Sequence, residues 1–375
     1  MKFTIFQLFL INIILFKTFN CSFQISIFRE LNKKGKNLII SPLSIFQILS
    51  LTSNGAKNET QNEMIQALQN CNINDLNKIN YDILEVAKNF KSVDIANSVM
   101  SKFTPLPSFL EIADKYYAPH EKLISAEQVN NWCSEKTHGK ISKIIDKLED
   151  DIEMILINAV YFKGKWSYKF EEKATIKKPF YNFGTQMKEI DTMRQLTRLS
   201  YYEDEKIQAV SLPYTSDGIS ALVVLPRENI DINKYIISLD LDKYNINQIV
   251  DNLKFAKVNL ELPKFELEYY SSLKEVLIDM GMEQAFTPEA DFSGLREENH
   301  LKIDEVLHKT YLKVNENGTE AAAVTAVVIE KTSARPTPET IYQMKVNRPF
   351  LFIIRSNRLP FENDILFISK IENID

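Results

Sequence analysis

The chain has 375 residues, of which 45% are hydrophobic and 25% charged, the composition of a soluble globular protein. Its net charge of −5 and pI near 5.7 argue against nucleic-acid binding, which usually needs a basic domain. We find no repeat, low-complexity tract or Pro/Gly/Ser-rich linker, so one large continuous domain is the simplest organisation.

The N-terminus has the pattern of a secretory signal peptide. Lys2 precedes an apolar run over residues 5–16, which is too short to span a bilayer but fits a signal h-region. We place the cleavage within residues 20–22, which makes 1–22 the signal peptide and 23–375 the mature domain. The alternative is an uncleaved apolar first helix. Secretion predicts an extracellular protein with no membrane segment, whose Cys71 and Cys133 form one bridge or stay as buried thiols.

The first third of the chain has mostly helical periodicity. Ser41 followed by Pro42 is a typical helix start, with Ser as N-cap and Pro at the first helical position. The helices predicted in this part cover residues 23–31, 42–51, 59–68, 82–90, 108–117 and 129–137.

Strand patterns dominate after residue 152. Residues 152–162 form a long apolar run around Asn158, typical of a strand buried on both faces. Further strands are predicted at 209–213, 219–226, 255–267, 301–308, 350–355 and 365–371, and helices at 232–238, 243–252 and 272–280. Helices first and strands later indicate an α+β fold with large antiparallel sheets.

Residues 316–333 alternate in a way that is compatible with a strand. Small or apolar side chains occupy one face from Thr319 to Ile329, while the opposite face begins and ends with Glu320 and Glu330. Three consecutive alanines, however, are strong helix formers. The segment is therefore either an ordinary core strand or one that can also exist outside a sheet.

The sequence lacks the motifs of common enzymes. It contains no G-x-S-x-G, H-E-x-x-H, C-x-x-C, Walker A or G-x-G-x-x-G motif beside its four histidines. We therefore predict that the protein is not an enzyme and needs no metal or cofactor. His308, which is alone on a predicted strand, is interpreted as a hydrogen-bonded core residue.

From Phe23 onward the chain resembles a serpin. The resemblance rests on Asn315-Glu-Asn-Gly-Thr-Glu-Ala-Ala-Ala, on Asn347-Arg-Pro-Phe, and on residues 37–45, 129–141, 157–166, 262–265, 291–294 and 306–309, all in the family's order. It implies three β-sheets, about eight or nine helices, and an exposed reactive loop at about 316–345. It also implies a native state that is not the most stable one.

The resemblance further implies inhibition of a serine endopeptidase as a suicide substrate. The protease cleaves the loop, the loop inserts as a central strand, and the acyl-enzyme is trapped. The expected target is an elastase-like or trypsin-like serine protease, or alternatively a cysteine protease, bound by a monomer. A non-inhibitory carrier or chaperone is the alternative function.

Matching the family's motifs assigns roles to residues of this chain. The hinge of the loop consists of Glu316, Gly318, Thr319, Glu320, Ala321, Ala322, Ala323 and Thr325. The polar cluster under the opening sheet, called the shutter, consists of Ser41, Ser44, Asn158 and His308. Small hinge side chains suit entry between existing strands, because a larger one would overpack them.

The scissile bond follows from counting along the loop. Fourteen positions after Gly318 comes Thr332, which gives cleavage at Thr332–Ser333. A shorter count selects Lys331, and counting back from Pro349 selects Arg335, which precedes a proline. We rank Thr332 first, Lys331 second and Arg335 third.

Several positions depart from the family's pattern. Asn58 replaces a usual turn glycine and creates a glycosylation sequon, whereas a glycan at the second sequon, Asn317, would lie beside the hinge and is predicted to be absent. Residues 117–129 are short for the family, which predicts a trimmed edge strand or helix. Ser369 and Ile374 replace a usual Gly and Pro near the C-terminus.

Overall fold

The computed structural model describes residues 23–33, 35–68, 72–87, 90, 92–116, 120–215, 218–239, 246–297, 301–319, 339–356 and 365–375. Residues 23–31 are helical, as the sequence predicts. The other α-helices with defined bounds are α2 (Pro42–Gly55), α3 (Asn58–Ala67), α4 (Ile73–Ala87), α5 (Pro107–Tyr116), α6 (Ala126–Lys136), α7 (Ile232–Ser238), α8 (Ile246–Asp251) and α9 (Lys274–Asp279).

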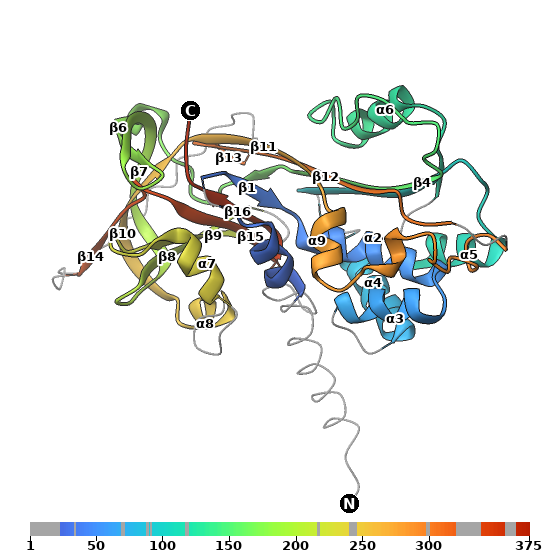
Figure 1. The fold of residues 1–375 in the computed structure, drawn as a ribbon. Helices are drawn as coiled ribbons and strands as arrows, with labels where there is room; N and C mark the ends of the chain where they lie inside the picture. The colour runs from blue at the N-terminus through green and yellow to red at the C-terminus, as the bar shows by residue number, and fades with distance from the viewer. Residues whose placement is uncertain are drawn as a thin grey trace, which may run out of the picture.

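Helix α2 is the central helix of the fold. It begins with Pro42 at its first position, as predicted, and every one of its residues is buried. Ser41 occupies the N-cap position with extended backbone, but its side chain makes no capping hydrogen bond, contrary to the predicted cap. Helices α3, α4 and α5 pack around α2, on the opposite side of the sheet from α6 (Figure 1).

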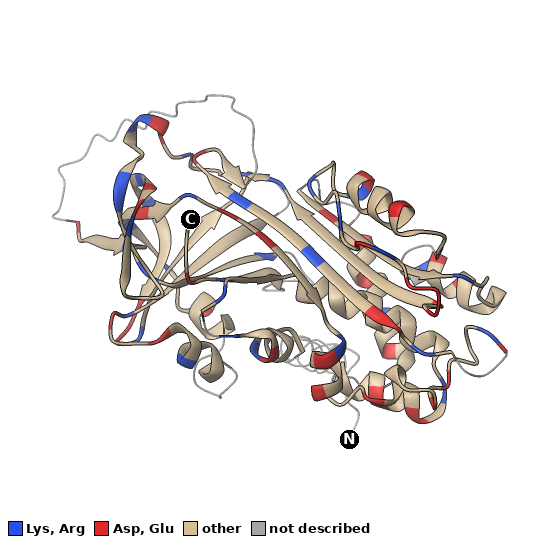
Figure 2. Cartoon of the chain, turned by 45° about the horizontal axis from the view of Figure 1, so that its top comes forward, with Lys and Arg blue, Asp and Glu red and all other residues tan. Residues whose placement is uncertain are grey.

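A seven-stranded sheet lies between α2 and α6. Its strand order is β3-β2-β4-β12-β13-β5, with β11 on the other side of β12. Figure 2 shows its strands side by side. The bounds are β2 (Val93–Ser101), β3 (Glu121–Lys122), β4 (Met154–Phe162), β5 (Gly164–Lys165), β11 (Phe265–Ser272), β12 (Glu305–Asn315) and β13 (Gly318–Thr319).

The remaining strands form a nine-stranded hydrogen-bonded sheet. The order is β1-β16-β15-β9-β8-β7-β10-β14, and β6 also pairs with β7. The bounds are β1 (Leu38–Ile40), β6 (Ile176–Asn182), β7 (Gln186–Glu203), β8 (Ile207–Pro213), β9 (Ile219–Pro226), β10 (Lys254–Pro263), β14 (Ile341–Lys345), β15 (Phe350–Ser356) and β16 (Ile365–Ile371).

The long strand β7 joins what would otherwise be two sheets. Most of β7 pairs with β6 and β10, and only its last four residues, from Ser200, pair with β8. The second and third sheets expected from the sequence are thus continuous along β7. The predicted α+β class is confirmed.

The structure corrects three sequence-based predictions of secondary structure. The helical first third contains the strand β2, and α4 begins at Ile73 rather than at residue 82. The predicted strand 255–267 is two strands in different sheets, because the chain turns at Lys264, whose N–H donates to the Asp191 carbonyl at 2.8 Å. The alternation shifts by one residue at this turn, because Val258, Leu260 and Leu262 are buried before it and Phe265 and Leu267 after it.

Candidate functional site: the seam between β4 and β12

The seam between β4 and β12 is the feature around which the site is built. The two strands are parallel neighbours, with Glu305 opposite Ile155 and Tyr311 opposite Tyr161. Strand β2 pairs antiparallel with β4, and β11 pairs antiparallel with β12. A new strand antiparallel to both β4 and β12 would therefore convert one parallel contact into two antiparallel ones.

The hinge already enters the top of this seam. After β12 the chain reverses, and Gly318 and Thr319 form β13, which pairs antiparallel with β12 and with β5. Gly318 has φ of 146°, and a Cβ atom there would lie 2.0 Å from the Gly164 carbonyl oxygen. Glycine is required at this position both by backbone angle and by the closeness of the neighbouring strand.

Thr319 is anchored in an aromatic pocket. It is completely buried, and its hydroxyl lies 2.7 Å from the Tyr214 hydroxyl. The Tyr214 ring stacks on Trp166 with centroids 4.5 Å apart, and the Trp166 indole N–H donates to the Asn315 carbonyl at 3.0 Å. Thr319, the first inward-facing residue of the predicted hinge, is thus fixed in a buried position.

Glu316 anchors the base of the hinge through a buried carboxylate. Lys264 Nζ lies 3.1 Å from Glu316 Oε1, and Thr175 donates to the same oxygen at 2.8 Å. Burial by itself raises the pKa of Glu316, but hydrogen bonds from its own backbone, Thr175 and Lys264, with the lysine charge, outweigh it and lower the pKa. The carboxylate is therefore ionised at neutral pH.

The four predicted shutter residues come together beneath the middle of the seam. The Ser41 backbone N–H donates to His308 Nε2 at 3.3 Å, so His308 carries its proton on Nδ1 and donates it to Asn158 Oδ1. The Asn158 amide in turn donates to Ser44 Oγ and to Asn97 Oδ1. This cluster ties β4, β12, β2 and the start of α2 together.

His308 is neutral in this cluster. It is completely buried, and burial lowers its pKa to about 3. The interpretation of His308 as a hydrogen-bonded core residue is therefore confirmed. Asn97 was not predicted from the sequence, where its only signal is its place in the alternating segment Val93–Ser101. Within this cluster, the buried Ser41 Oγ has no hydrogen-bond partner among the described residues.

The outer face of the seam is covered by α6. Val129 and Cys133 of α6 are buried against outward-facing side chains of both strands, including Tyr161 of β4 and Leu307 of β12. Cys133 is a free thiol, so it does not form the bridge left open by the sequence. Its partner in that bridge, Cys71, lies outside the described residues.

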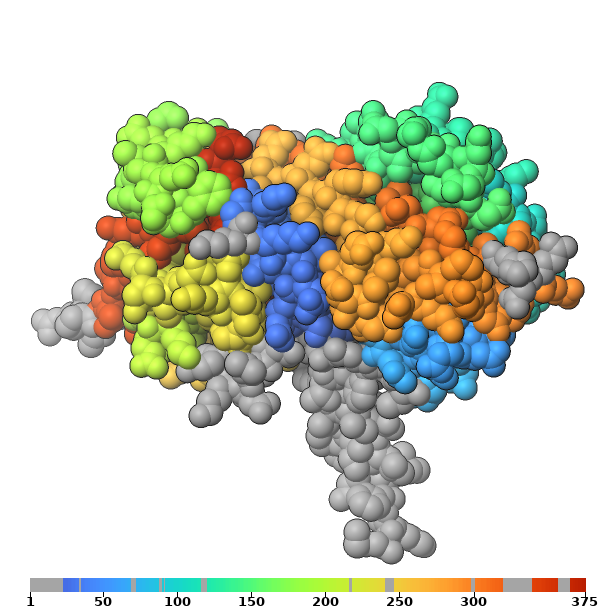
Figure 3. Space-filling model, in the orientation of Figure 1, coloured from blue at the N-terminus to red at the C-terminus, as the bar shows by residue number. Residues whose placement is uncertain are grey.

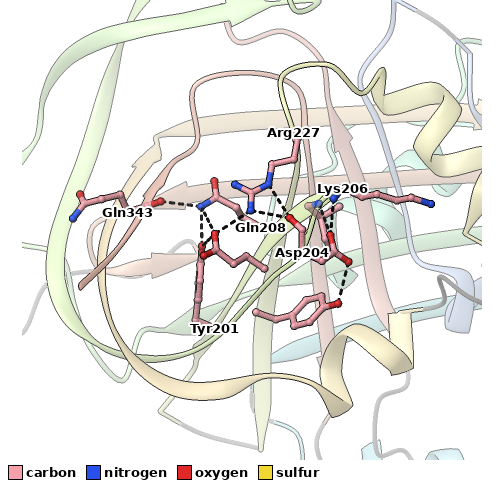
Figure 4. A network of polar contacts seen from close by, with 9 residues as sticks. Tyr201, Asp204, Lys206, Gln208, Arg227 and Gln343 are labelled. Atoms are coloured by element: carbon pink, nitrogen blue, oxygen red, sulfur yellow. Dashed lines mark hydrogen bonds and ion pairs between the residues drawn. The ribbon is translucent and has the colours of Figure 1, made fainter. Parts of the chain in front are cut away.

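The distal end of the loop returns to the fold at β14, an edge strand. Gln208 Nε2 donates to the Gln343 carbonyl of β14 at 2.8 Å and to the Tyr201 hydroxyl at 2.7 Å (Figure 4). In the same network, Arg227 donates to the Asp204 carbonyl at 2.8 and 3.1 Å. These side chains fasten β14 to the ends of β7, β8 and β9.

Other predicted site residues are distributed as follows. Asn58 is exposed with φ of 51°, a conformation that favours the glycine usual there, and its amide donates to Asp291 at 2.7 Å. Asn317 is partly buried, and its carbonyl accepts from the Trp166 backbone N–H.

Some predicted site residues lie outside the described residues. They are the remaining hinge positions Glu320, Ala321, Ala322, Ala323 and Thr325, and the candidate bond residues Lys331, Thr332, Ser333 and Arg335.

The edge strand beyond β2 is short in the described part of the chain. Strand β3 has two residues, Glu121 and Lys122.

No group of three or more His, Cys, Asp or Glu side chains in the described part of the chain is arranged to hold a metal ion. Over the same residues, none of the helices has the length and apolar character needed to cross a bilayer.

A protein-family model described as Serpin (serine protease inhibitor) matches residues 18–374. The chain is a serpin. Intracellular coagulation inhibitor 2 of Tachypleus tridentatus is 33% identical over 378 residues, covering 96% of this chain and 91% of that protein. A thermophilic serpin, tengpin, in its native state has a TM-score of 0.87 at 35% identity, with 96% of this chain and 94% of that chain covered.

A protein named for binding thyroxine also has this fold. Thyroxine-binding globulin in complex with thyroxine has a TM-score of 0.83 at 25% identity, covering 96% of this chain and 99% of that chain. Serpins are typically inhibitors of proteases rather than enzymes. Since one relative is named as intracellular and another binds thyroxine, family membership assigns neither inhibition nor secretion to this particular chain.

Proposed function

We propose that this serpin inhibits a serine endopeptidase as a suicide substrate. The observation that carries the proposal is β13: two hinge residues already pair antiparallel with the strands on both sides of the seam. The rest of the seam is closed, because β4 and β12 pair directly below this point. This arrangement suits a native state from which the loop can continue to enter.

Continuing the register of β13 gives the position of each further residue. Thr319 lies opposite Val314 and Gly164, so each step forward in the loop is one step back in β12 and β4. Thr325 then falls opposite both His308 and Asn158, which are themselves opposite each other. The two extrapolations agree, so an inserted strand fits the seam without a bulge.

The same register assigns a face to each loop residue. Side chains opposite each other in adjacent strands point to the same face, so Ala321, Ala323 and Thr325 follow Thr319 toward α2. Thr325 brings a hydroxyl to the shutter, where the buried Ser41 Oγ lacks a partner among the described residues. We infer that insertion gives the Ser41 hydroxyl a hydrogen-bond partner. Leaving such a buried group unpaired costs about 1–3 kcal/mol.

The chemistry of inhibition follows from the distance that the loop travels. The protease serine attacks the carbonyl of Thr332, our first choice, and the leaving peptide begins with Ser333. Thr332 lies thirteen positions after Thr319. At about 3.3 Å per residue, insertion places the acylated end roughly 40 Å from Thr319, past the far end of β4. A protease dragged that far has its oxyanion hole distorted, and deacylation stalls.

The setting of the inhibitor is proposed from the sequence. We propose removal of residues 1–22, secretion, and action as an extracellular monomer without cofactor, nucleic acid or membrane contact. Asn58 is proposed to carry a glycan, which its exposure supports. Asn317 is proposed to be unoccupied, because its sequon threonine is Thr319, which is buried in the aromatic pocket. A glycan on Asn317 of active protein, detected by mass spectrometry, would contradict this.

The proposed function is tested by mixing the protein with elastase-like and trypsin-like proteases. We expect a covalent complex that survives SDS, and a released C-terminal fragment that begins at Ser333. A fragment beginning at Thr332 or Pro336 would instead select Lys331 or Arg335. Cleavage of the loop by every protease without any stable complex would contradict the proposal.

A non-inhibitory carrier or chaperone is the second candidate, favoured by the similarity to thyroxine-binding globulin. Such a protein would be cleaved in its loop without trapping the protease. It would also show little change in melting temperature after cleavage, because no new central strand forms.

A further inference from the structure

The outward face of strands β7, β10 and β14 exposes three large apolar side chains. Leu196, Phe255 and Ile341 expose 54%, 63% and 43% of their surface. The register of the strands places them on one face: Leu196 is opposite Asn259 on β10, and Ile341 is opposite Lys257.

Basic side chains surround these apolar ones. Four of them, Arg194, Arg198, Lys257 and Lys345, share the outward face with two carboxylates, Glu261 and Glu339. Both carboxylates have cationic partners, since Lys178 Nζ lies 2.5 Å from Glu261 and Arg198 lies 2.6 Å from Glu339. Arg194 and Lys257 also lie 3.7 and 3.8 Å from Glu261 and Glu339, respectively. The four cations outnumber the two carboxylates by two, so the face has a small positive excess on a chain whose net charge is −5.

This face, which we call the β7/β10/β14 face, is connected to the reactive loop by a short length of chain. Ile341 lies nine positions after Thr332. Their extended length is at most about 30 Å. A single-domain protease of about 230 residues is roughly 45 Å across. A protease that has engaged the scissile bond is therefore large enough to reach the β7/β10/β14 face as well.

We propose that the β7/β10/β14 face is a second docking surface for the target protease, selecting one with an acidic surface and an exposed apolar side chain beside its active site. The proposal rests on the proposed inhibitory function and adds a criterion for the target besides the loop sequence. A positive excess on this face suits an encounter complex, where opposite charge raises the association rate. Large exposed apolar side chains at its centre supply the short-range contact.

The experiment compares Leu196→Ser and Phe255→Ser with the control Ile124→Ser. Ile124 is 66% exposed and lies two residues before α6, on the opposite side of the molecule from β14 (Figure 3). We expect each test variant to lower the association rate constant with its protease about tenfold, while the control stays within twofold of the unmodified protein. The stoichiometry of inhibition should not change, because docking precedes the competition between insertion and deacylation.

Ionic strength provides a second measurement. Raising the salt from about 0.05 to 0.5 M should slow association of the unmodified protein, because screening weakens the attraction of an acidic protease. If no protease forms a complex, the proposed function fails and this inference with it. If complexes form but both test variants match the control with every reactive protease, only the second docking surface is overturned.

Discussion

The two large sheets differ in how their central strands are held. In the nine-stranded sheet, β15 lies antiparallel between β9 and β16, and every residue of these three strands is buried. In the seven-stranded sheet, the central pair β4 and β12 is parallel, and a polar cluster lies beneath it. The first arrangement is a fully buried and mostly apolar core, whereas we propose that the second is a seam whose hydrogen bonds can be exchanged for others.

The largest functional effect should come from a charge on the inward face of the loop. In Ala323→Glu an uncompensated carboxylate would have to enter the buried seam, which is strongly unfavourable. We expect the protein to become mainly a substrate, with its stoichiometry of inhibition raised at least about tenfold. The matched control is Glu320→Gln on the opposite face, which should inhibit normally. Equal inhibition by both variants would refute the assignment of faces.

The largest stability effect should come from the nine-stranded sheet. Phe352 is completely buried, with its ring 5.4 Å from that of Phe265. Phe352→Ala should lower the free energy of unfolding by about 3–5 kcal/mol in intact and loop-cleaved protein alike. Denaturant titration of both forms measures this, with the exposed Phe255→Ala as control. A loss confined to one form would mean that this sheet also rearranges.

Breaking the shutter should act mainly on the intact form. Asn158→Ala leaves His308 Nδ1, Ser44 and Asn97 without their shared partner, and we expect a loss of about 2–3 kcal/mol. Spontaneous loss of inhibitory activity at 37 °C should also become faster. The exposed Asn252→Ala serves as control, and an unchanged rate of activity loss in Asn158→Ala would show that the shutter does not hold the seam.

Acidification should weaken the intact protein through His308. Its folded pKa of about 3 is below the usual value of 6.5, so the unfolded chain binds the proton more readily between these pH values. Stability is complete above about pH 6.5 and falls as the pH decreases, by about 2 kcal/mol at pH 5. Unfolding of His308→Gln should lack this part of the pH dependence. Identical profiles would show that His308 does not stay neutral.

The smallest effect is expected at the distal end of the loop. Gln208→Leu removes the hydrogen bond to the Gln343 carbonyl and should cost about 1 kcal/mol. Because β14 is an edge strand, its release would let the uncleaved loop enter the seam more easily. We expect a moderately shorter activity half-life than in Gln248→Leu, a control on helix α8. Equal activity half-lives in the two variants would show that Gln208 does not restrain the loop.

The residues of the site that lie within recognisable family motifs could be predicted from the sequence. Ser41, Ser44, Asn158 and His308 were assigned by resemblance, and the structure brings them together. Asn97 was missed because β2 has mixed burial and lies in a part of the chain with helical periodicity. The pocket of Thr319 was missed because Tyr214 is far from Trp166 in sequence and pairs with it only as an isolated bridge. The division of residues 255–267 between two sheets depends on tertiary contacts, which alternation alone does not contain.

The central claim is that β13 is the beginning of a strand that the seam completes. It is tested by comparing the melting temperature of the intact protein with that of protein cleaved between residues 320 and 338. For a chain of this size, each 10 kcal/mol gained on insertion raises the melting temperature by roughly 14 °C. The account predicts a sharp rise after cleavage, which Ala323→Glu should abolish. An unchanged melting temperature in the cleaved, unmodified protein would contradict it.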